Sequence, residues 1–388
     1  MEFAERVNSL TPEGAYYVLA KAQALEAQGK PIIHLEIGQP DVATFANIAK
    51  AGISAIEKGH TRYMPSAGMR ELRNVIAQDA GTRRGLQFTP EQVVVGPGAK
   101  PFLFFPTLAL VQQGDEVMYP DPGFPTYKAM IEVAGGLPIP VPLCEEEDFA
   151  FDLDAFDRLI SPRTRMVIIN SPSNPTGGVL HRAALEYIAA AAIQHNFWVL
   201  SDEIYSRLVY ETTTQSIATL PGMLERTIIC DGFSKTYAMT GWRLGYGIMP
   251  VKLAERVDLL LTHSVGCTAS FTQIAGIEAI RGSQEMVEAV VMEYKRRRDA
   301  LVGGLNELPG IHCRVPSGAF YAFPNISGLG QSSEWIAEYL LEEAGVALLP
   351  GTSFGRNGEG YLRLCFANSL ENIFSAVEQM KDALRKLV

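Results

Sequence analysis

One lysine and one arginine stand eight positions apart in the run DGFSKTYAMTGWRLG, directly after the apolar segment ERTIICDGF. Lys235, close to the end of a predicted strand, can be withdrawn from water and held near other charges. Such an environment lowers the pKa of an amine toward the range needed for covalent chemistry with a carbonyl. Arg243 carries the rigid fork that suits a phosphate group. Two isolated cations would ordinarily be solvated surface residues. A molecule that carries both a carbonyl and a phosphate would satisfy both residues.

Pyridoxal 5'-phosphate (PLP) is a cofactor with both groups. Asp202 ends the apolar run WVLSD, and Tyr205 follows three positions later. A carboxylate that faces a pyridine nitrogen keeps this nitrogen protonated, and a protonated ring draws electrons from a substrate carbanion. The alternative interpretation makes Asp202 a helix N-cap. Its position on the strand before that of Lys235 favours the cofactor.

Two turns rich in small residues supply further candidates. The turn NSPSNPTG, residues 170–177, is dense in Asn, Pro and Gly, so its shape is strongly constrained. The turn GPGAK, residues 96–100, follows a predicted strand and opens a helix, where backbone N–H groups can bind phosphate. It has neither the Walker spacing nor the dinucleotide-binding spacing. Each turn alone is weak evidence for a site.

Taken in order, these motifs resemble the class I (fold-type I) PLP-dependent aminotransferases, the family that includes aspartate, alanine and kynurenine aminotransferases. The resemblance runs from about Leu35 in LEIGQPD to Phe366 in YLRLCFA. It implies that Lys235 holds PLP covalently and then moves the proton during catalysis, with Asp202 and Tyr205 as the other catalytic residues. The cofactor contacts that it implies come from Gly98, Ala99, Lys100, Phe124, Asn174, Asp202, Tyr205, Ser234, Lys235 and Arg243, with Tyr63 from a partner subunit.

The resemblance also implies the binding of the substrate. Arg363, in YLRLCFA, would clamp the α-carboxylate with Gly38 and Asn174, and Phe124 would stack on the cofactor ring. Two departures from the family pattern are visible. Gly232 replaces the serine often found three residues before the lysine, and Ser234 is the remaining candidate for that hydroxyl contact. Glu13 stands where the family often has serine, and an acid there would repel a distal substrate carboxylate.

The chain is predicted to adopt an α/β fold, the fold type I of PLP-dependent transferases. Apolar runs separated by helical segments indicate a mostly parallel seven-stranded sheet between helices, followed by a smaller α+β domain. The strands expected are 92–95, 116–119, 138–141, 166–170, 198–201, 227–230 and 244–249, and the helices expected between them include 100–111, 127–134, 182–194 and 253–261. We expect residues 1–45 to form an N-terminal arm of the small domain, 46–290 the large domain and 291–388 the small domain.

Composition, charge and the spacing of cysteines argue against several classes of protein. The formal charge of −10 disfavours a nucleic-acid partner, because phosphate binding needs a basic face. The five cysteines are dispersed, which predicts reduced thiols in a cytoplasmic protein, and no Cys/His pattern predicts a metal site. We see neither a secretory signal nor an apolar run that could span a membrane.

The resemblance therefore implies an aminotransferase that moves the amino group of an L-amino acid to a 2-oxo acid by a ping-pong mechanism, as a homodimer. Neutral or aromatic donors are favoured, since neither Arg207 nor Arg62 is clearly placed to bind a second carboxylate. A PLP-dependent β-eliminating lyase on the same fold is the alternative. A hydrolase is disfavoured, because GTSFG (residues 351–355) precedes a loop and not the helix that a nucleophile elbow needs. The sequence leaves the donor, the acceptor and the pathway undetermined.

Overall fold

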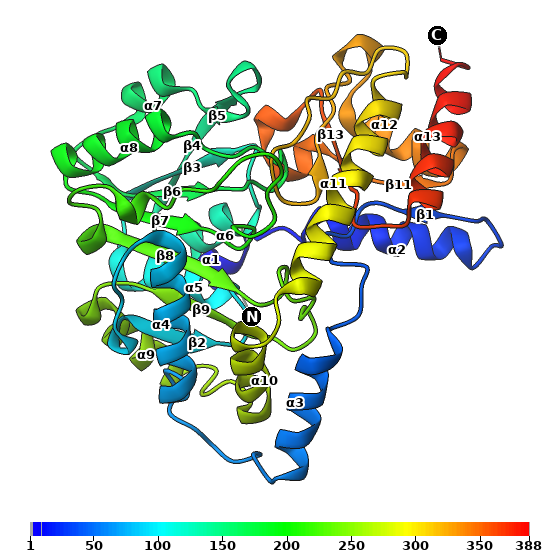
Figure 1. Cartoon of the computed structure of the whole chain (residues 1–388). Coiled ribbons are helices and arrows are strands. Elements are labelled where there is room, and N and C mark those ends of the chain that lie inside the picture. Colours follow the sequence, from blue (N-terminus) through cyan, green and yellow to red (C-terminus); the bar gives the residue numbers. More distant parts are fainter. Residues whose placement is uncertain (1–2, 9, 388) are drawn as a thin grey trace.

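A mostly parallel sheet of eight strands forms the centre of the protein, in the order β2-β9-β8-β7-β6-β3-β4-β5 (Figure 1). The computed structural model describes residues 3–8 and 10–387. The strands of the sheet are β2 (Val93–Gly96), β3 (Glu116–Asp121), β4 (Leu137–Cys144), β5 (Ala150–Phe151), β6 (Thr164–Asn170), β7 (Trp198–Asp202), β8 (Thr227–Gly232) and β9 (Gly245–Ile248).

The seven strands predicted from apolar runs are present, and the fold class is confirmed. The sheet has one strand more than predicted. Ala150–Phe151 forms the short β5, which pairs antiparallel with Cys144 and Leu143 at the end of β4. Two residues at a sheet edge leave no apolar run in the sequence, so the prediction missed this strand. β9 also runs antiparallel to both of its neighbours, β2 and β8.

Helices cover both faces of the sheet. The helices of the described residues are α1 (Glu5–Asn8), α2 (Gly14–Glu26), α3 (Ala46–Glu57), α4 (Arg70–Arg84), α5 (Lys100–Leu110), α6 (Thr126–Val133), α7 (Leu153–Leu159), α8 (Arg182–His195), α9 (Val251–Thr262), α10 (Ser270–Arg281), α11 (Glu285–Leu305), α12 (Ser333–Glu343) and α13 (Leu370–Leu384), and α2, α12 and α13 pack in the second body rather than on the sheet. Successive strand residues pack into different cores, as period-two geometry requires. Val117 packs with α5, α6 and α9, whereas Met118 packs with α7 and α8. Continuous burial on both faces explains the unbroken apolar runs.

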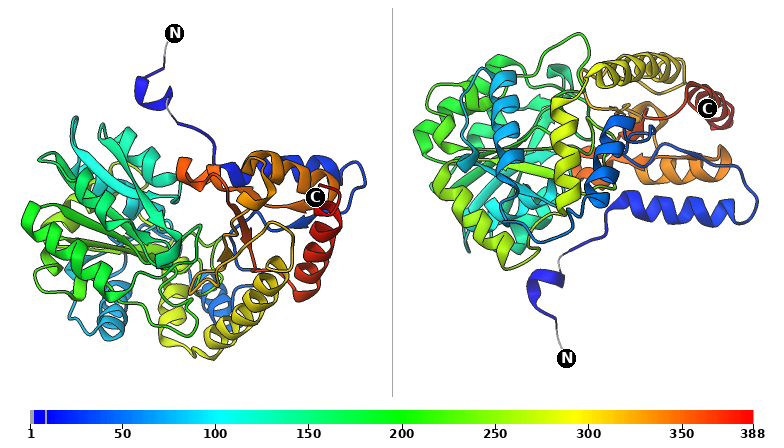
Figure 2. Two further views of the ribbon diagram at one scale, coloured as in Figure 1. Left: turned by 90° about the horizontal axis from the view of Figure 1, so that it is seen from above. Right: turned by 60° about the horizontal axis from the view of Figure 1, so that its bottom comes forward.

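A second body lies beside the large sheet and contains β10 (Tyr321–Ala322), β12 (Leu349–Pro350) and β13 (Leu362–Cys365) in one antiparallel sheet. The N-terminal β1 (Ile33–His34) pairs with β11 (Val346–Ala347) of this body. Figure 2 shows the two bodies side by side, with α2 next to the C-terminal elements. The boundaries of the domains at residues 45 and 290 stay a prediction.

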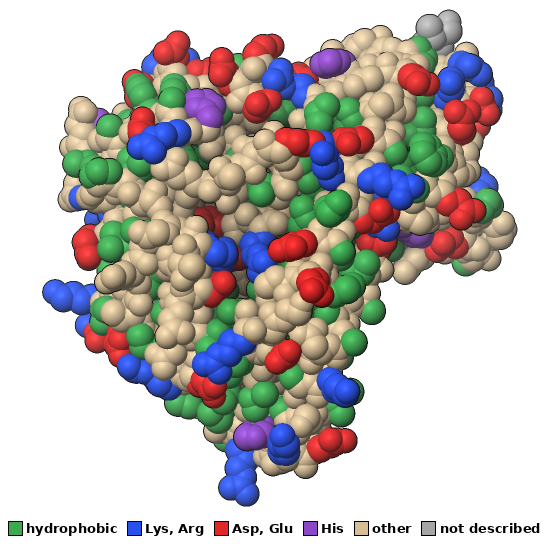
Figure 3. Space-filling model, viewed as in Figure 1, with side chains coloured by type: hydrophobic (Ala, Val, Ile, Leu, Met, Phe, Trp, Pro, Cys, Tyr) green, Lys and Arg blue, Asp and Glu red, His purple; other side chains and the backbone are tan. Residues whose placement is uncertain are grey.

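Acidic and basic side chains are interspersed over the face shown in Figure 3. Within residues 3–8 and 10–387, no helix is long and apolar enough to cross a membrane. The same residues contain no group of three or more His, Cys, Asp or Glu side chains arranged to hold a metal ion.

The sheet brings the predicted chemistry to one edge. β6, β7 and β8 are parallel, with Asn170 paired to Asp202 and Asp202 paired to Cys230. Their carboxyl ends therefore lie next to each other, where ligands bind in open α/β sheets. Lys235 follows the end of β8 by three residues.

Candidate active site

Lys235 lies in a deep but partly accessible position, with its amine donating a hydrogen bond of 2.6 Å to the carbonyl oxygen of Gly38. Burial lowers the pKa of Lys235 to about 8, and the charges of Arg363 and Arg243 act in the same direction. Cys365 and Asp202 oppose this shift. The amine is therefore neutral at a pH where a free lysine is almost fully protonated, as a nucleophile for a carbonyl must be.

Asp202 is buried at the end of β7, and the residues after it form turns, so the helix N-cap interpretation is wrong. The hydroxyl of Tyr127, on α6, donates a hydrogen bond of 2.8 Å to Asp202 Oδ2. Burial raises the pKa of Asp202 to about 6, while the hydrogen bond from Tyr127 lowers it, and the charges of Asp231 and Glu203 raise it. A buried carboxylate of this kind favours a cationic partner.

Arg363 projects from β13 and is buried, although an arginine in a strand is usually solvated. Its Nη1 donates to Asn174 Oδ1 at 3.3 Å, and its Nη2 donates to the carbonyl oxygen of Glu36. Among the described residues, its Nε is a buried donor without a hydrogen-bond partner. The guanidinium lies 4.6 Å from the ring centroid of Tyr321. A buried cation with a free donor is suited to a carboxylate ligand.

Asn174 is positioned by its own turn. The backbone N–H of Asn174 donates to Asn170 Oδ1 at 2.8 Å, and Asn170 Nδ2 donates to the carbonyl oxygen of Asp202 at 3.0 Å. The turn is therefore tied to the end of β7. Tyr205 is buried, and its hydroxyl lies 2.7 Å from that of Tyr321. Lys235 Nζ lies 5.9 Å from the centroid of the Tyr205 ring.

The GPGAK turn and Arg243 form a second part of the site. Arg243 is exposed and donates to the carbonyl oxygens of Thr240 at 2.8 Å and Pro97 at 3.4 Å. Gly98 has a φ of +91°, and a Cβ atom there would lie 2.3 Å from Arg243 Nη2. The backbone and the guanidinium thus form a cradle that only glycine permits. An exposed arginine beside the start of α5 is well placed for a phosphate.

Phe124 packs edge-to-face on Tyr127, with ring centroids 5.7 Å apart. Lys100 Nζ lies 5.1 Å from the Phe124 ring centroid and forms an ion pair with Glu13. The N-terminal arm therefore reaches the site, and Lys100 points to this arm. Ala99 and Ser234 adjoin the site in sequence, and Ser234 is buried.

Tyr63 is the predicted residue that the single chain does not bring into the site. It is 98% exposed. The predictions also missed Tyr127, Tyr321 and the carbonyl of Glu36. Tyr127 was expected only as the start of a helix, 127–134, which gave no sign that its hydroxyl would reach Asp202. Tyr321 resembled an ordinary core aromatic.

Comparisons with known proteins agree with this geometry. Residues 30–379 match the family described as aminotransferase class I and II. This chain belongs to that family. The aspartate aminotransferase of Pyrococcus horikoshii is 40% identical over 98% of this chain and 97% of its own length. The aromatic-amino-acid aminotransferase 2 of Thermococcus litoralis is 37% identical over 100% and 99%.

The solved structures of aminotransferases include the same fold. The aspartate aminotransferase from Thermus thermophilus with maleate superposes with a TM-score of 0.94 at 36% identity, covering 99% of this chain and 100% of that one. The predicted family and fold type are confirmed. The roles of individual residues stay predictions.

Proposed function

We propose that this protein is a PLP-dependent aminotransferase that moves the amino group of an L-amino acid to a 2-oxo acid by a ping-pong mechanism. The observation that carries the proposal is the buried constellation around Lys235. Its amine has a pKa of about 8, the carboxylate of Asp202 lies on the neighbouring strand, and Arg363 keeps a free donor within the described residues. A nucleophilic amine, a buried anion and a buried cation are the three groups that a PLP aminotransferase requires.

The residues present fit both ends of the PLP molecule, its ring and its phosphate. Asp202 would pair with the ring nitrogen, Asn174 and Tyr205 with the phenolic oxygen, and Phe124 would lie against the ring. Gly98, Ala99, Ser234 and Arg243 would hold the phosphate, as the cradle between Gly98 and Arg243 supports. When bound, PLP supplies the electron sink that stabilises negative charge at the substrate Cα.

The chain itself would perform two tasks. Arg363, with Gly38 and Asn174, would bind the substrate α-carboxylate and so orient the Cα–H bond. Lys235 Nζ would then take the proton from the substrate Cα and deliver it to the cofactor carbon that carries the transferred nitrogen. Its lowered pKa supports this task, because an amine that is neutral near pH 8 can accept a proton.

Neutral or aromatic amino acids are proposed as donors, with 2-oxoglutarate or pyruvate as acceptor. The ion pair between Glu13 and Lys100 supports this preference, because it neutralises the cation that lies over the Phe124 ring. A distal carboxylate would have to compete with Glu13 for Lys100. Arg207 instead donates to Tyr237 and Gln284, at 2.8 and 2.7 Å.

The visible spectrum of the purified protein tests the proposed activity. A yellow band that an amino acid bleaches and a 2-oxo acid restores is expected, with parallel lines in double-reciprocal kinetics. Lys235→Ala is expected to abolish turnover while it retains part of the PLP. Ammonia and pyruvate released without an oxo-acid acceptor would instead identify the β-eliminating lyase.

Glu13→Gln tests the proposed preference for donors. Removal of the acid frees Lys100, so kcat/KM for aspartate is expected to rise about two- to fivefold relative to phenylalanine, since a partly exposed ion pair is worth at most about 1 kcal/mol. The matched control is Glu186→Gln, which removes an acid from the exposed pair with Arg182 on α8. An unchanged ratio of kcat/KM for aspartate to that for phenylalanine in Glu13→Gln would contradict the proposed role of Glu13 in donor preference.

A homodimer is proposed with Tyr63 as the residue that reaches the partner subunit's site. The nearly complete exposure of this aromatic side chain supports the proposal, together with the exposed Ile53 and Ile56 on α3. Sedimentation velocity is expected to give a dimer. Tyr63→Phe is expected to weaken PLP binding without dissociating the dimer. A fully active monomer would contradict both statements.

A further inference from the structure

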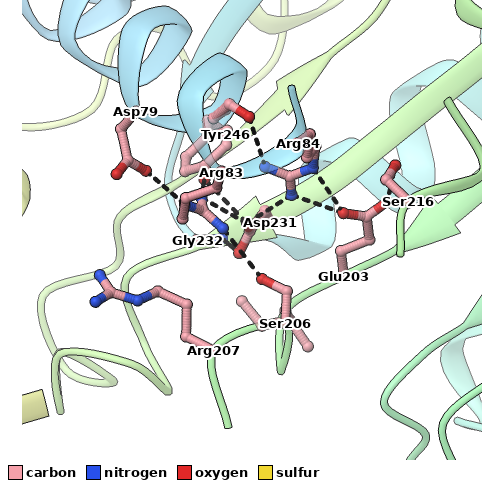
Figure 4. A network of polar contacts seen from close by, with 12 residues as sticks. Asp79, Arg83, Arg84, Glu203, Ser206, Arg207, Ser216, Asp231, Gly232 and Tyr246 are labelled. Carbon is pink, nitrogen blue, oxygen red and sulfur yellow. Dashed lines mark hydrogen bonds and ion pairs between the residues drawn. The ribbon is translucent and has the colours of Figure 1, made fainter. Parts of the chain in front are cut away.

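A buried network of charged side chains joins the end of α4 to the ends of β7 and β8 (Figure 4). Its centre is Arg84, the last residue of α4. Nε and Nη2 of Arg84 donate to Glu203 Oε2 at 2.9 and 2.6 Å, and Nη2 also lies 3.3 Å from Asp231 Oδ2. The side chains of these three residues are 4 to 7% exposed. Charges so deeply buried are costly unless each one is paired.

Hydroxyl groups and a second arginine complete the network. Glu203 Oε1 accepts hydrogen bonds from Ser201 at 3.0 Å and Ser216 at 2.6 Å. Asp231 Oδ2 accepts a hydrogen bond of 3.0 Å from Tyr246. The further ion pairs join Arg83 to Asp79 at 2.8 Å and to Asp231 at 3.5 Å. Both oxygens of Glu203 therefore have partners, as buried carboxylates require.

The network adjoins the site through the backbone. Glu203 is the next residue after Asp202, and its N–H donates to the carbonyl oxygen of Cys230 at 2.8 Å. Asp231 lies four positions before Lys235, on the strand paired with β7. A shift of either carboxylate would therefore move the strand end that carries a predicted catalytic residue. Arg84 therefore adds a side-chain bridge between Glu203 and Asp231 to the backbone pairing of the two strand ends.

We propose that Arg84 is a positioning residue which, through Glu203 and Asp231, holds the ends of β7 and β8 and balances the charge beneath Asp202 and Lys235. The inference rests on the proposed binding of PLP to Lys235. None of the three network residues is expected to touch substrate or cofactor. They act through the electrostatic potential and the backbone geometry that they impose on Asp202 and Lys235.

The charges around the two predicted catalytic residues support this role. The groups that face Asp202 are Tyr127 of α6, Cys230 and Asp231 of β8, Glu203 and Tyr205 of the segment after β7, and Lys235. The groups that face Lys235 are Arg363 and Cys365 of β13, Arg243, Asp202 and Tyr205. The carboxylates of Asp231 and Glu203 raise the pKa of Asp202. Loss of the Arg84 charge would leave Glu203 without its counterion and Asp231 with Arg83 alone.

The pH titration of the visible band of the PLP-loaded protein tests the inference. Arg84→Met removes a positive charge, which favours the protonated form of the lysine-bound cofactor, so the midpoint is expected to rise by about one pH unit. Glu203→Gln removes a negative charge and keeps the shape of the side chain, so its midpoint is expected to fall by a similar amount. The double variant is expected to titrate like the wild type.

The matched control is Arg73→Met. Arg73 is also a partly buried arginine of α4, but it donates to the carbonyl oxygens of Pro90 and Val93. Both Arg→Met variants are expected to lower the melting temperature, and only Arg84→Met is expected to move the titration midpoint. The opposite directions of the two charge changes separate an electrostatic role from a loss of packing.

Midpoints that stay unchanged, or that move in one direction in both single variants, would overturn the inference. If Arg84→Met does not fold, Glu203→Gln alone decides, since a fall of its midpoint supports the inference and an unchanged midpoint refutes it. A wild-type protein that never forms the band would refute the proposed function, and the inference with it. A normal band with unmoved midpoints refutes the inference alone.

Discussion

Lys235 is expected to react with pyridoxal, the aldehyde without the phosphate, at a pH where an ordinary lysine amine is almost fully protonated. The pKa of Lys235 is lowered to about 8 from an ordinary value of 10.5, chiefly by burial and then by Arg363 and Arg243. At pH 7.5 the neutral fraction is about one quarter for Lys235 and about one in a thousand for a free lysine. The amine is thus about 200-fold more available, which corresponds to about 3 kcal/mol.

The assay is stopped-flow mixing of cofactor-free protein with pyridoxal between pH 6 and 11, followed by the visible absorbance. The rate is expected to rise with pH and to level off above about pH 8, because a lowered pKa moves deprotonation to lower pH. The control is an N-acetyl-lysine amide, whose rate should keep rising until about pH 10.5.

Arg363→Met sharpens this prediction. Removal of one nearby cation is expected to raise the pKa of Lys235, so the rate at pH 7.5 should fall several-fold while the rate at pH 11 changes little. A midpoint near 10.5 in the wild-type protein would refute the reasoning, because it would mean that Lys235 is solvated like a surface lysine. An unchanged midpoint in Arg363→Met would refute the role of the neighbouring charge.

Two further substitutions test the positioning of the site. Gly245→Ala places a Cβ atom 2.4 Å from the backbone carbonyl carbon of Gly98. The substitution is expected to cost about 1–3 kcal/mol of stability, measured by denaturant unfolding, and to weaken PLP binding, measured by cofactor titration. A Gly245→Ala variant of wild-type stability would contradict this close approach. Tyr127→Phe removes the donor to Asp202, which is expected to raise the pKa of this carboxyl above about 6 and to destabilise the protein by about 1–3 kcal/mol. Calorimetry checks the stability, and unchanged unfolding would contradict the importance of this hydrogen bond.

Local patterns along the chain determined seven strands of the large sheet, four of the helices beside them and the strand ends where the predicted site residues lie. Apolar runs separated by helical segments were sufficient for seven strands, because a parallel sheet that is buried on both faces needs such runs. Lys235 and Asp202 follow or end these strands, so their meeting at one sheet edge follows from the topology. Arg363 was assigned by resemblance to a family motif, since its strand alone would predict a solvated side chain.

Contacts between distant segments were decided only by the tertiary structure. Tyr127 meets Asp202 across 75 positions, Glu13 meets Lys100 across 87, and Arg84 meets Glu203 across 119. Periodicity reports which face of an element is buried, but not which side chain of another element will face it. A buried charge is stable only beside its partner, and the packing of whole elements determines where that partner lies.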